Sequence, residues 1–520
     1  MENNRSIQVI ASDLYNCLAR RFPVCCFSDE FYYFPQALSA ETDWTAWDDL
    51  SPEGVRDALS VLRKFRLDLE GLQGSGWEDD GDRRTRRLLS RHVDVLMEQL
   101  EDMKLFSSKP TFILTVASAG LLQALQSQDE HALGARLSAL PGFLQGAFES
   151  LDKVPVLFRD LGLEMAEDIR KWIATLGDVR PMSQAAESVD LFSKKLARIP
   201  TTDRFQLDPD QLERIVCHHS GSGFTVAEAL AELEDEERET GSLLARESRN
   251  LAGSEDFNEL FGALKPDPLP EGGPIRLLFL ETARLKEHCA DLGIREASRA
   301  PDVDIRRLPH SLAAIRAADS YNARPGNPSG GGTFYIFAGG TLGRSALSVH
   351  PSYRMTVAHE TYPGHHLLDT CRWNHPDPVR RPLEYPLFYE GWACFGEDLM
   401  LQSGAFDRAY DRFLVTWRRY RHAVRGRTDL LLHSGRVDLE TAAVHLSQAG
   451  LTRVRAIETV RKYALQPAYQ MCYSIGRRGF QSLFRSTGGE GVPNFINAVL
   501  SEGELLFQDL EHVLKQKLST

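Results

Sequence analysis

The chain has 520 residues, of which 42% are hydrophobic and 26% are charged, the proportions of an ordinary globular protein. Its net charge of −13 at pH 7 argues against general binding to nucleic acid, which needs a basic surface. Because no run of 18 apolar residues occurs, we expect neither a membrane-spanning helix nor a membrane partner.

Eight cysteines are scattered along the chain without C-x-x-C spacing. This usage indicates reduced thiols rather than a disulfide framework. No apolar segment of signal-peptide length follows the first residues, Met1 to Ser6. We therefore expect a cytoplasmic protein, and the sequence leaves its oligomeric state open.

Apolar residues recur three and four positions apart over much of the chain, with charges between them, as they do in amphipathic helices. This periodicity predicts helices at 53–73, 86–106, 130–150, 158–176, 225–250 and 439–465. Strand-like segments are few, and the clearest are Ile275–Leu280 and Thr333–Ala338. The segment Lys265–Pro274 is rich in proline and glycine and is the best candidate linker. We expect a helical N-terminal lobe at 1–265 and a catalytic, metal-binding lobe at 266–520.

A predicted helix at Pro351–Tyr362 leads into the segment His359-Glu360-Thr361-Tyr362-Pro363-Gly364-His365-His366, which combines three histidines with a carboxylate. Imidazole and carboxylate groups hold catalytic zinc while leaving one position open for water. In the usual H-E-x-x-H arrangement the second histidine follows one helical turn after the first, but Pro363 stands there and cannot bind metal. Pro363 and Gly364 can distort the helix. We therefore interpret the segment as H-E-x-x-H with two extra residues, with His359 and His365 as ligands and His366 as the alternate.

Carboxylates supply the other expected roles at this site. Glu360 is the predicted general base, which would take a proton from water on the metal. Glu390, 25 residues after His365, is the predicted third ligand and precedes a helix that ends near Gly404. Glu397 shares a helix face with Glu390 and is expected either to orient a ligand histidine or to form a surface salt bridge.

A helix predicted at Pro467–Phe484 carries Tyr473 and Arg477, whose hydroxyl and guanidinium groups can stabilise an oxyanion. Filling of the core is an equally good interpretation of Tyr473 and the better one for Tyr469. The arginines from Arg418 to Arg421 fit a solvated helix face.

These residues resemble the family called domain of unknown function 885, grouped with the zincin-type (gluzincin-like) metallopeptidases. Its H-E-x-x-P-G-H-H pattern matches 359–366, its E-G-W-A pattern matches 390–393, and its downstream acid matches Glu397. A run of Pro, Gln, Tyr and Gly near its C-terminus matches 466–477. The resemblance implies a mainly α-helical, zincin-like body with a deep cleft and a small β-sheet near the metal helix. It also implies that the strand at 333–338 is an edge strand that pairs with the substrate backbone.

The leading hypothesis is a hydrolase with one Zn²⁺ per chain that cleaves an amide or peptide bond in a short peptide or small amide conjugate. The first alternative is hydrolysis of a non-peptide amide in a small-molecule pathway. The second is a non-catalytic binding protein with a structural or vestigial metal site. Glu360 argues against the last, because a structural site normally has four protein ligands and no use for a general base. Manganese, cobalt or iron also suit these ligands.

Overall fold

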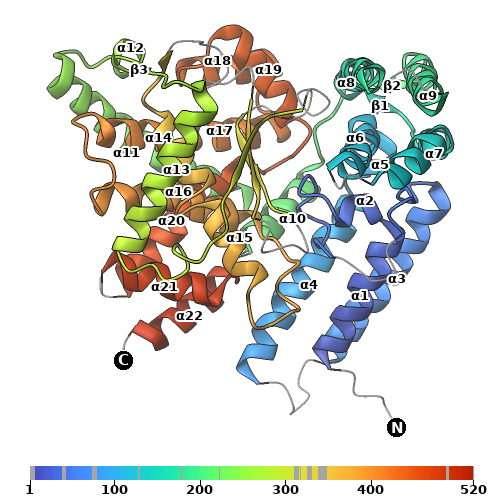
Figure 1. Ribbon diagram of the computed structural model, residues 1–520, viewed down its shortest axis with the longest axis horizontal. Coiled ribbons are helices and arrows are strands. Elements are labelled where there is room, and N and C mark those ends of the chain that lie inside the picture. Colours follow the sequence, from blue (N-terminus) through green and yellow to red (C-terminus); the bar gives the residue numbers. More distant parts are fainter. Residues whose placement is uncertain are drawn as a thin grey trace. The chain divides into compact units, whose positions relative to one another are not determined.

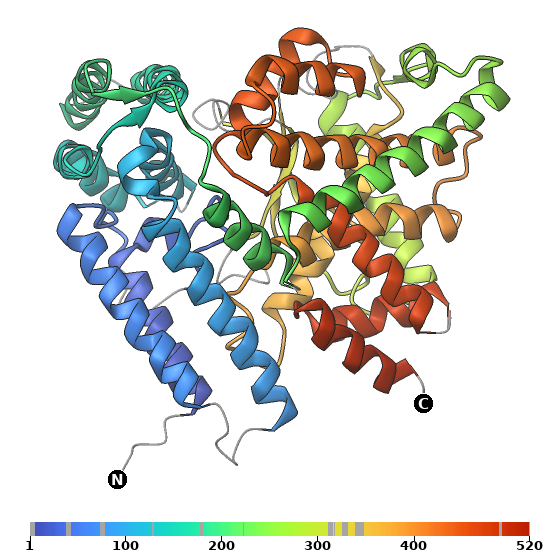
Figure 2. The same cartoon turned by 180° about the vertical axis from the view of Figure 1, so that it is seen from behind.

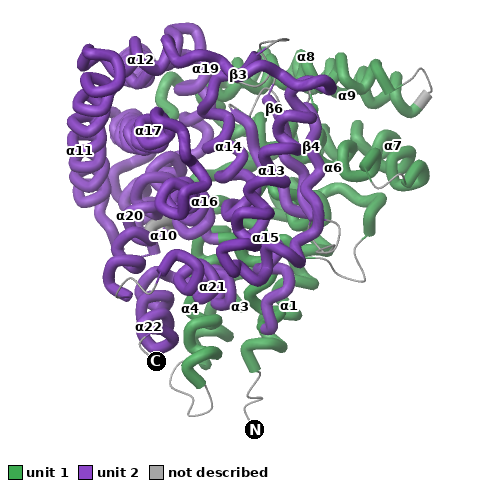
Figure 3. The backbone as a smooth tube through the Cα atoms, turned by 60° about the vertical axis from the view of Figure 1, so that its left-hand side comes forward, with its two compact units in different colours: residues 1–205, 309–316, 377–384 green, residues 206–308, 317–376, 385–520 purple. Residues whose placement is uncertain are grey.

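The computed structural model describes residues 6–37, 43–72, 79–126, 129–176, 180–221, 223–309, 316, 318–324, 331–337, 348–487 and 491–518. The chain divides into two compact units (Figure 3). Unit 1 comprises residues 1–205, 309–316 and 377–384, and unit 2 comprises 206–308, 317–376 and 385–520. The first boundary therefore follows Phe205, whereas the sequence led us to expect it at residue 265.

Unit 1 is a helical body whose elements are coloured blue to teal in Figure 1. Its helices are α1 (Ile7–Arg21), α2 (Pro23–Cys26), α3 (Pro52–Gly71), α4 (Asp80–Glu101), α5 (Leu105–Ser108), α6 (Pro110–Gln126), α7 (Glu130–Phe148), α8 (Val156–Thr175) and α9 (Arg180–Leu196). Strand β1 (Val154–Pro155) pairs in parallel with β2 (Thr201–Thr202). Helix α6 is apolar on almost every side, so it is buried and packs against α7 and α8.

Unit 2 contains the remaining elements. Its helices are α10 (Pro209–Ser220), α11 (Val226–Ala252), α12 (Phe257–Ala263), α13 (Gly273–Asp291), α14 (Tyr353–Glu360), α15 (His365–Trp373), α16 (Pro386–Gln402), α17 (Asp411–His433), α18 (Leu439–Gln448), α19 (Arg453–Tyr463), α20 (Met471–Ser486), α21 (Val492–Glu502) and α22 (Phe507–Leu518). Strand β3 (Asp267–Pro268) pairs antiparallel with β7 (Ser348–Val349). A three-stranded sheet has the order β4 (Asp304–Arg307), β6 (Thr333–Ile336), β5 (Ser320–Asn322).

Helix α16 lies at the centre of unit 2, with nearly every side chain buried. It packs closely on α20 because two glycines face each other: a Cβ atom on Gly391 would lie 2.5 Å from the Cα of Gly476. Helix α14 also contacts α16, and α17 contacts α11, α16 and α20. Figure 2 shows the long α11 running across this unit. The carboxylates of α16 and the histidines of α14 and α15 are therefore brought together by the core itself.

The mainly α-helical class expected from the sequence is confirmed, but several elements differ. Ile275–Leu280 is not a strand; it lies in α13, whose buried residues recur at helical spacing from Leu278 to Cys289. The helix predicted at 439–465 is two helices, because Gly450 adopts a left-handed conformation (φ 94°) and Thr452 caps the start of α19. Lys265–Pro274 is no linker between the units, since it contributes β3 within unit 2.

The strand predicted at Thr333–Ala338 exists as β6, although Ala338 lies outside the described residues. It is not an edge strand, because β4 pairs with one side and β5 with the other. A substrate backbone therefore finds no open edge on β6. No single helix in the described ranges is long and apolar enough to cross a membrane; residues 80–108 and 110–126 reach that length and composition only together, across a 90° bend. The eight cysteines form no disulfide bond.

Candidate metal centre

The histidine segment forms a helix, a turn and a second helix. Helix α14 ends at Glu360, and α15 begins at His365. Gly364 makes the turn possible, because a Cβ atom there would overlap the carbonyl oxygen of His359. The carbonyl of Pro363 accepts a hydrogen bond of 2.8 Å from the indole of the fully buried Trp392. The Gly and Trp of the two motifs thus fix the turn that separates the histidines.

Three side chains converge beside this turn. The Nε2 atoms of His359 and His365 each lie 3.4 Å from Oε2 of Glu390, and all three side chains are buried. For ligands at about 2.0–2.2 Å from a tetrahedral zinc ion, two ligand atoms are separated by about 3.3–3.6 Å. The spacing of these atoms therefore fits a zinc ion held by two histidines and one carboxylate.

Unsatisfied atoms point to the same set. Oε2 of Glu390 is buried and accepts no hydrogen bond from the described residues. A carboxylate oxygen buried without a donor is costly, so a cation at this position would complete its coordination. The other oxygen, Oε1, accepts a 2.7 Å hydrogen bond from the hydroxyl of Tyr469. Burial alone would raise the pKa of Glu390, but the rings of His359 and His365, each 3.4 Å from Oε2, outweigh it and hold this pKa low.

The opposite nitrogen of His359 is held by an ion pair. Its Nδ1 donates to Oε1 of Glu397 at 3.1 Å, and Arg418 binds both oxygens of that carboxylate at 2.5 and 2.7 Å. A proton fixed on Nδ1 leaves Nε2 with its lone pair available for a metal. Burial lowers the pKa of His359, and Cys394, Glu390 and Glu397 together outweigh burial and raise it.

Cys394 and Glu397 with His359 form a second geometric group of possible ligands. Two observations make this second group the poorer metal site. The carboxylate of Glu397 is already occupied by Arg418, and burial raises the pKa of the Cys394 thiol, which opposes formation of the thiolate ligand. We therefore assign Glu397 to the positioning of His359.

His365 is oriented by an aromatic neighbour. Its ring stacks on Tyr389 with centroids 4.1 Å apart, and the Tyr389 hydroxyl donates to Asp369 at 2.8 Å. Arg372 pairs with the other oxygen of Asp369 at 2.5 Å. The influence of Asp369 on His365 therefore passes through Tyr389.

His366 does not join the group. Its Nε2 donates to the carbonyl of Pro301 at 2.8 Å, and its Nδ1 lies 3.2 Å from the hydroxyl of Tyr321. Successive residues of a helix are about 100° apart around its axis, so His365 and His366 face different sides of α15. With both ring nitrogens engaged, His366 is not the alternate ligand that the sequence left open.

Glu360 faces a cavity of about 560 Å³ that is also lined by His359, Tyr473 and residues of α17. No hydrogen bond joins its carboxylate to another described residue, and it is not a member of the ligand group. Burial raises its pKa, against the lowering effect of His359 and His365. It is thus a buried carboxylate next to the ligands that has no hydrogen-bond partner among the described residues.

The two predicted oxyanion donors lie in different places. Tyr473 lines the cavity, stacks on His422 at 4.9 Å, and interacts through its hydroxyl with Glu390. Arg477 is buried away from the cavity, with one nitrogen 2.7 Å from Asp398 and another 2.8 Å from Glu236. It ties α20 to α16 and α11.

Sequence reasoning missed several residues of the site. Tyr469, expected in the core, binds Glu390. Arg418, expected on a solvated face, holds Glu397, and Arg421 and His422 line the cavity. Their spacing of three and four along α17 was the available signal, because such residues share one helix face. Nothing in the sequence indicated that this face meets α16 rather than water.

The family model that matches this chain covers all residues of the candidate metal centre. A family model described as "Bacterial protein of unknown function (DUF885)" matches residues 213–505, more than half of the chain. A "putative lipoprotein of unknown function" from Shewanella oneidensis has the same fold, with a TM-score of 0.74, 14% identity and coverage of 98% of this chain and 99% of that one. The "putative lipoprotein" from Colwellia psychrerythraea gives a TM-score of 0.77, 14% identity and 98% coverage of both chains. No curated protein matches the sequence.

These structures overturn the expectation of a cytoplasmic location. Both are described as lipoproteins, a class that is anchored to membranes or secreted. The expectation was based partly on scattered cysteines, which indicate only that a disulfide framework is missing. Beyond this correction, identity of 14% bears on the fold alone.

Proposed function

The chain belongs to the DUF885 family of bacterial proteins of unknown function, and from its candidate metal centre we propose that it is a zinc-dependent hydrolase of amide or peptide bonds. The observation that carries this proposal is the convergence of His359, His365 and the unsatisfied Oε2 of Glu390 beside the uncommitted carboxylate of Glu360. Such a set, with three protein ligands and an open cavity, is typical of catalytic rather than structural zinc. This is the zincin-like chemistry that the motifs suggest.

A bound zinc ion would supply Lewis acidity, polarising a carbonyl oxygen and lowering the pKa of water at its open position. Glu360 would accept the proton of the attacking water and pass it to the leaving nitrogen. Tyr473, whose hydroxyl lies beside Glu390, would donate a hydrogen bond to the oxygen on which negative charge develops. Glu397 and Arg418 would keep His359 in the tautomer that presents Nε2.

The size of the cavity supports small substrates. About 560 Å³ lies within the range of small-molecule sites, roughly 300–1,000 Å³. A short peptide or a small amide conjugate fits such a volume, whereas a folded protein does not. The walls of the cavity include Trp417 of α17, Leu451 of the loop between α18 and α19, and Tyr463 of α19.

Metal content tests the proposal directly. We expect about one zinc per chain by plasma mass spectrometry in protein purified without a metal-affinity tag. His359→Ala and Glu390→Ala should both lose the ion, because each removes one of three ligands. His366→Ala is the matched control and should retain it, because that ring is bound to Pro301 and Tyr321. Wild-type protein that takes up no zinc after loading and removal of the excess would overturn the proposal.

A further inference from the structure

The cavity beside the candidate metal centre has a basic wall. Arg418, His422 and Arg425 follow one another at intervals of four and three along α17, and Arg421 precedes His422. This spacing sets all four on one helix face, and all four line the cavity that Glu360 and His359 also line. At 1.5 Å per residue the wall is about 10 Å long.

The charges of this wall are not equally compensated. Arg418 is neutralised by Glu397, and Arg455, which also lines the cavity, pairs with Glu458 at 2.7 Å. Arg421 has no ion pair with any carboxylate in the part of the chain that the structure describes. Its guanidinium lies 4.5 Å from the ring of Trp417, and its buried Nε has no hydrogen-bond partner among those residues.

Arg425 is also without a carboxylate partner within the described ranges. It donates to the side-chain oxygen of Gln470 at 2.6 Å and to Nδ1 of His422 at 3.3 Å, and it lies over the ring of Tyr473 at 4.7 Å. These neutral contacts fix the direction of the guanidinium without cancelling its charge. Two neighbouring cations therefore face one small cavity.

Asp319, a carboxyl group that lines the cavity, does not offset this charge well. Burial raises its pKa to about 7. Burial, followed by the charges of Arg425 and Arg418, lowers the pKa of Arg421 to about 9. A cation that is disfavoured by burial and by like charges becomes favourable when an anion binds next to it.

We propose that the cavity binds a substrate through the α-carboxylate of its terminal amino acid, with Arg421 as the main anchor and Arg425 as the second. A guanidinium stacked on an aromatic ring presents its N–H edge for bidentate binding of a planar carboxylate. In an amide formed by an α-amino acid, only one Cα atom separates the scissile nitrogen from that carboxylate. An anchor in the same cavity as Glu360 and His359 therefore suits this class.

This inference rests on the proposed function and makes it more specific. The reaction would release a C-terminal amino acid from a short peptide, or the amino acid of an N-acyl amino acid. The amide C–N bond breaks, water gives its hydroxyl to the carbonyl carbon, and its proton goes to the nitrogen of the released amino acid. The two sources share the same recognised group, a free α-carboxylate.

A binding experiment tests the anchor apart from catalysis. Titration calorimetry on the full chain would compare the binding of 3-phenylpropanoate with that of 3-phenylpropanol. The alcohol lacks the negative charge, and neither compound has an amide bond that could be hydrolysed. We expect the acid to bind about 10- to 100-fold more tightly than the alcohol, the range of a charge-assisted hydrogen bond. The same titration on Glu390→Ala separates binding by arginine from binding by metal, and it should keep the preference.

Variants of α17 identify the residue responsible. Arg421→Gln should lose the preference for the acid, and Arg421→Lys, which keeps the charge without the fork, should keep part of it. Arg412→Gln is the matched control, because Arg412 is exposed on the same helix and does not line the cavity. Equal binding of acid and alcohol by the wild type, or an undiminished preference in a folded Arg421→Gln protein, would overturn the proposal.

Kinetics distinguish the two sources and the two proposals. N-benzoyl-Gly-Phe, its C-terminal amide and N-acetyl-Phe would be supplied to the zinc-loaded protein. We expect Arg421→Gln to raise KM for the free acids about 10- to 100-fold and to leave KM for the amide unchanged. Hydrolysis of acid and amide at equal KM would refute the carboxylate anchor while supporting the hydrolase. An intact preference in calorimetry without zinc uptake would support the anchor and refute the metal hydrolase.

Discussion

The two units of this protein differ in how some of their buried ionisable groups are partnered. In unit 1, burial is the leading influence and favours the neutral form. It lowers the pKa of Lys109 to about 7 and that of His92 to about 4, and it raises the pKa of Asp48 to about 6. In unit 2, burial acts in the same direction on Glu397 and Glu236, but the arginines that lie against these two carboxylates outweigh it and lower their pKa.

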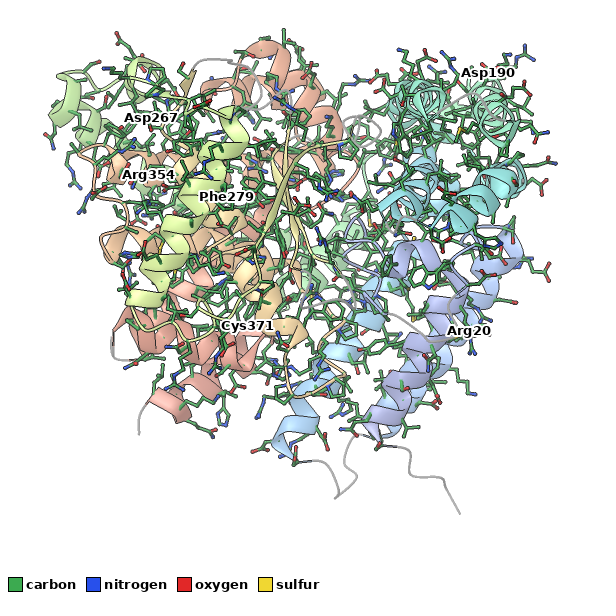
Figure 4. All side chains as sticks on the ribbon, in the orientation of Figure 1. Arg20, Asp190, Asp267, Phe279, Arg354 and Cys371 are labelled. Atoms are coloured by element: carbon green, nitrogen blue, oxygen red, sulfur yellow. The ribbon has the colours of Figure 1, made fainter. Side chains whose placement is uncertain are left out.

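Three groups of arginine and carboxylate side chains lie in unit 2. Arg418 holds Glu397 against His359. Arg477 joins Asp398 and Glu236, and for Glu236 the charges of Arg477 and Arg419 outweigh burial and lower the pKa. Arg354, labelled in Figure 4, pairs with Asp411 at 2.6 Å and with Glu281 at 3.3 Å. Each group joins helices that carry or support the ligands.

The arginine–carboxylate groups of unit 2 keep charges buried at a cost in free energy. Removing two charges from water is expensive, and a buried ion pair seldom stabilises a protein more than apolar packing would. Pairs of this kind are therefore weak evidence for stability and better evidence for positioning. Their presence beside the candidate metal centre accords with the proposal that the chemistry takes place in unit 2.

Glu360→Gln gives the largest expected effect. It should lower kcat for amide hydrolysis about 10²- to 10⁴-fold, the usual contribution of a general base, while one zinc per chain is retained. Glu287→Gln, exposed on α13, is the matched control and should leave kcat unchanged. Activity in Glu360→Gln within threefold of wild type would transfer the proton-handling role to another group.

Arg477→Met should reduce the free energy of unfolding by about 3–5 kcal/mol, because it leaves Asp398 and part of Glu236 buried without their partner. Urea denaturation would measure the loss, beside Arg485→Met, which is exposed on the same helix. At temperatures where the variant remains folded, its kcat should equal that of the wild type. A kcat reduced 100-fold in folded Arg477→Met would instead support the oxyanion role considered from the sequence.

Glu397→Gln should weaken zinc binding about 10- to 100-fold, the usual cost of altering the partner of a ligand histidine. Competition with a chromophoric chelator would measure the affinity, with Gln402→Ala, exposed on α16, as control. If Glu397 were itself the ligand, in the group with Cys394, then Cys394→Ser would weaken zinc binding as much as Glu397→Gln does. An effect of Glu397→Gln alone would support the positioning role.

The sequence was most informative where residue spacing itself encodes geometry. The three converging side chains could be predicted from the segment 359–366 and from Glu390. Both the histidine motif and the start of the helix that carries Glu390 are local features of the sequence. Local features could not choose between His365 and His366: the choice depends on Pro301 and Tyr321, which lie far away in the sequence.

Long-range pairing also explains the main errors. Arg418 to Arg421 have the composition of a solvated face, yet α17 packs in the core of unit 2, so these side chains meet Glu397, Glu236 and the cavity. Ile275–Leu280 has the composition of a strand, but it forms part of α13. There Leu278 is buried and Phe279 is exposed, because the two side chains lie on different sides of the helix. Composition describes a segment, whereas its role is set by what packs against it.

The smallest expected effect concerns unit 1. The pKa of Lys109 is lowered by burial from 10.5 to about 7, so between these values the unfolded chain binds more protons than the folded one. The free energy of unfolding should therefore rise with pH above 7, by at most about 1.4 kcal/mol per pH unit from this group, and the full cost of burying its charge is present below pH 7. Lys109→Met should remove that rise between pH 7 and 9 and stabilise the protein at pH 7.

Urea denaturation at several pH values would measure the difference, with Lys64→Met, exposed on α3, as control. A pH dependence of Lys109→Met equal to that of the wild type would mean that Lys109 remains charged through contacts like those of unit 2, and the contrast between the units would not extend to this residue.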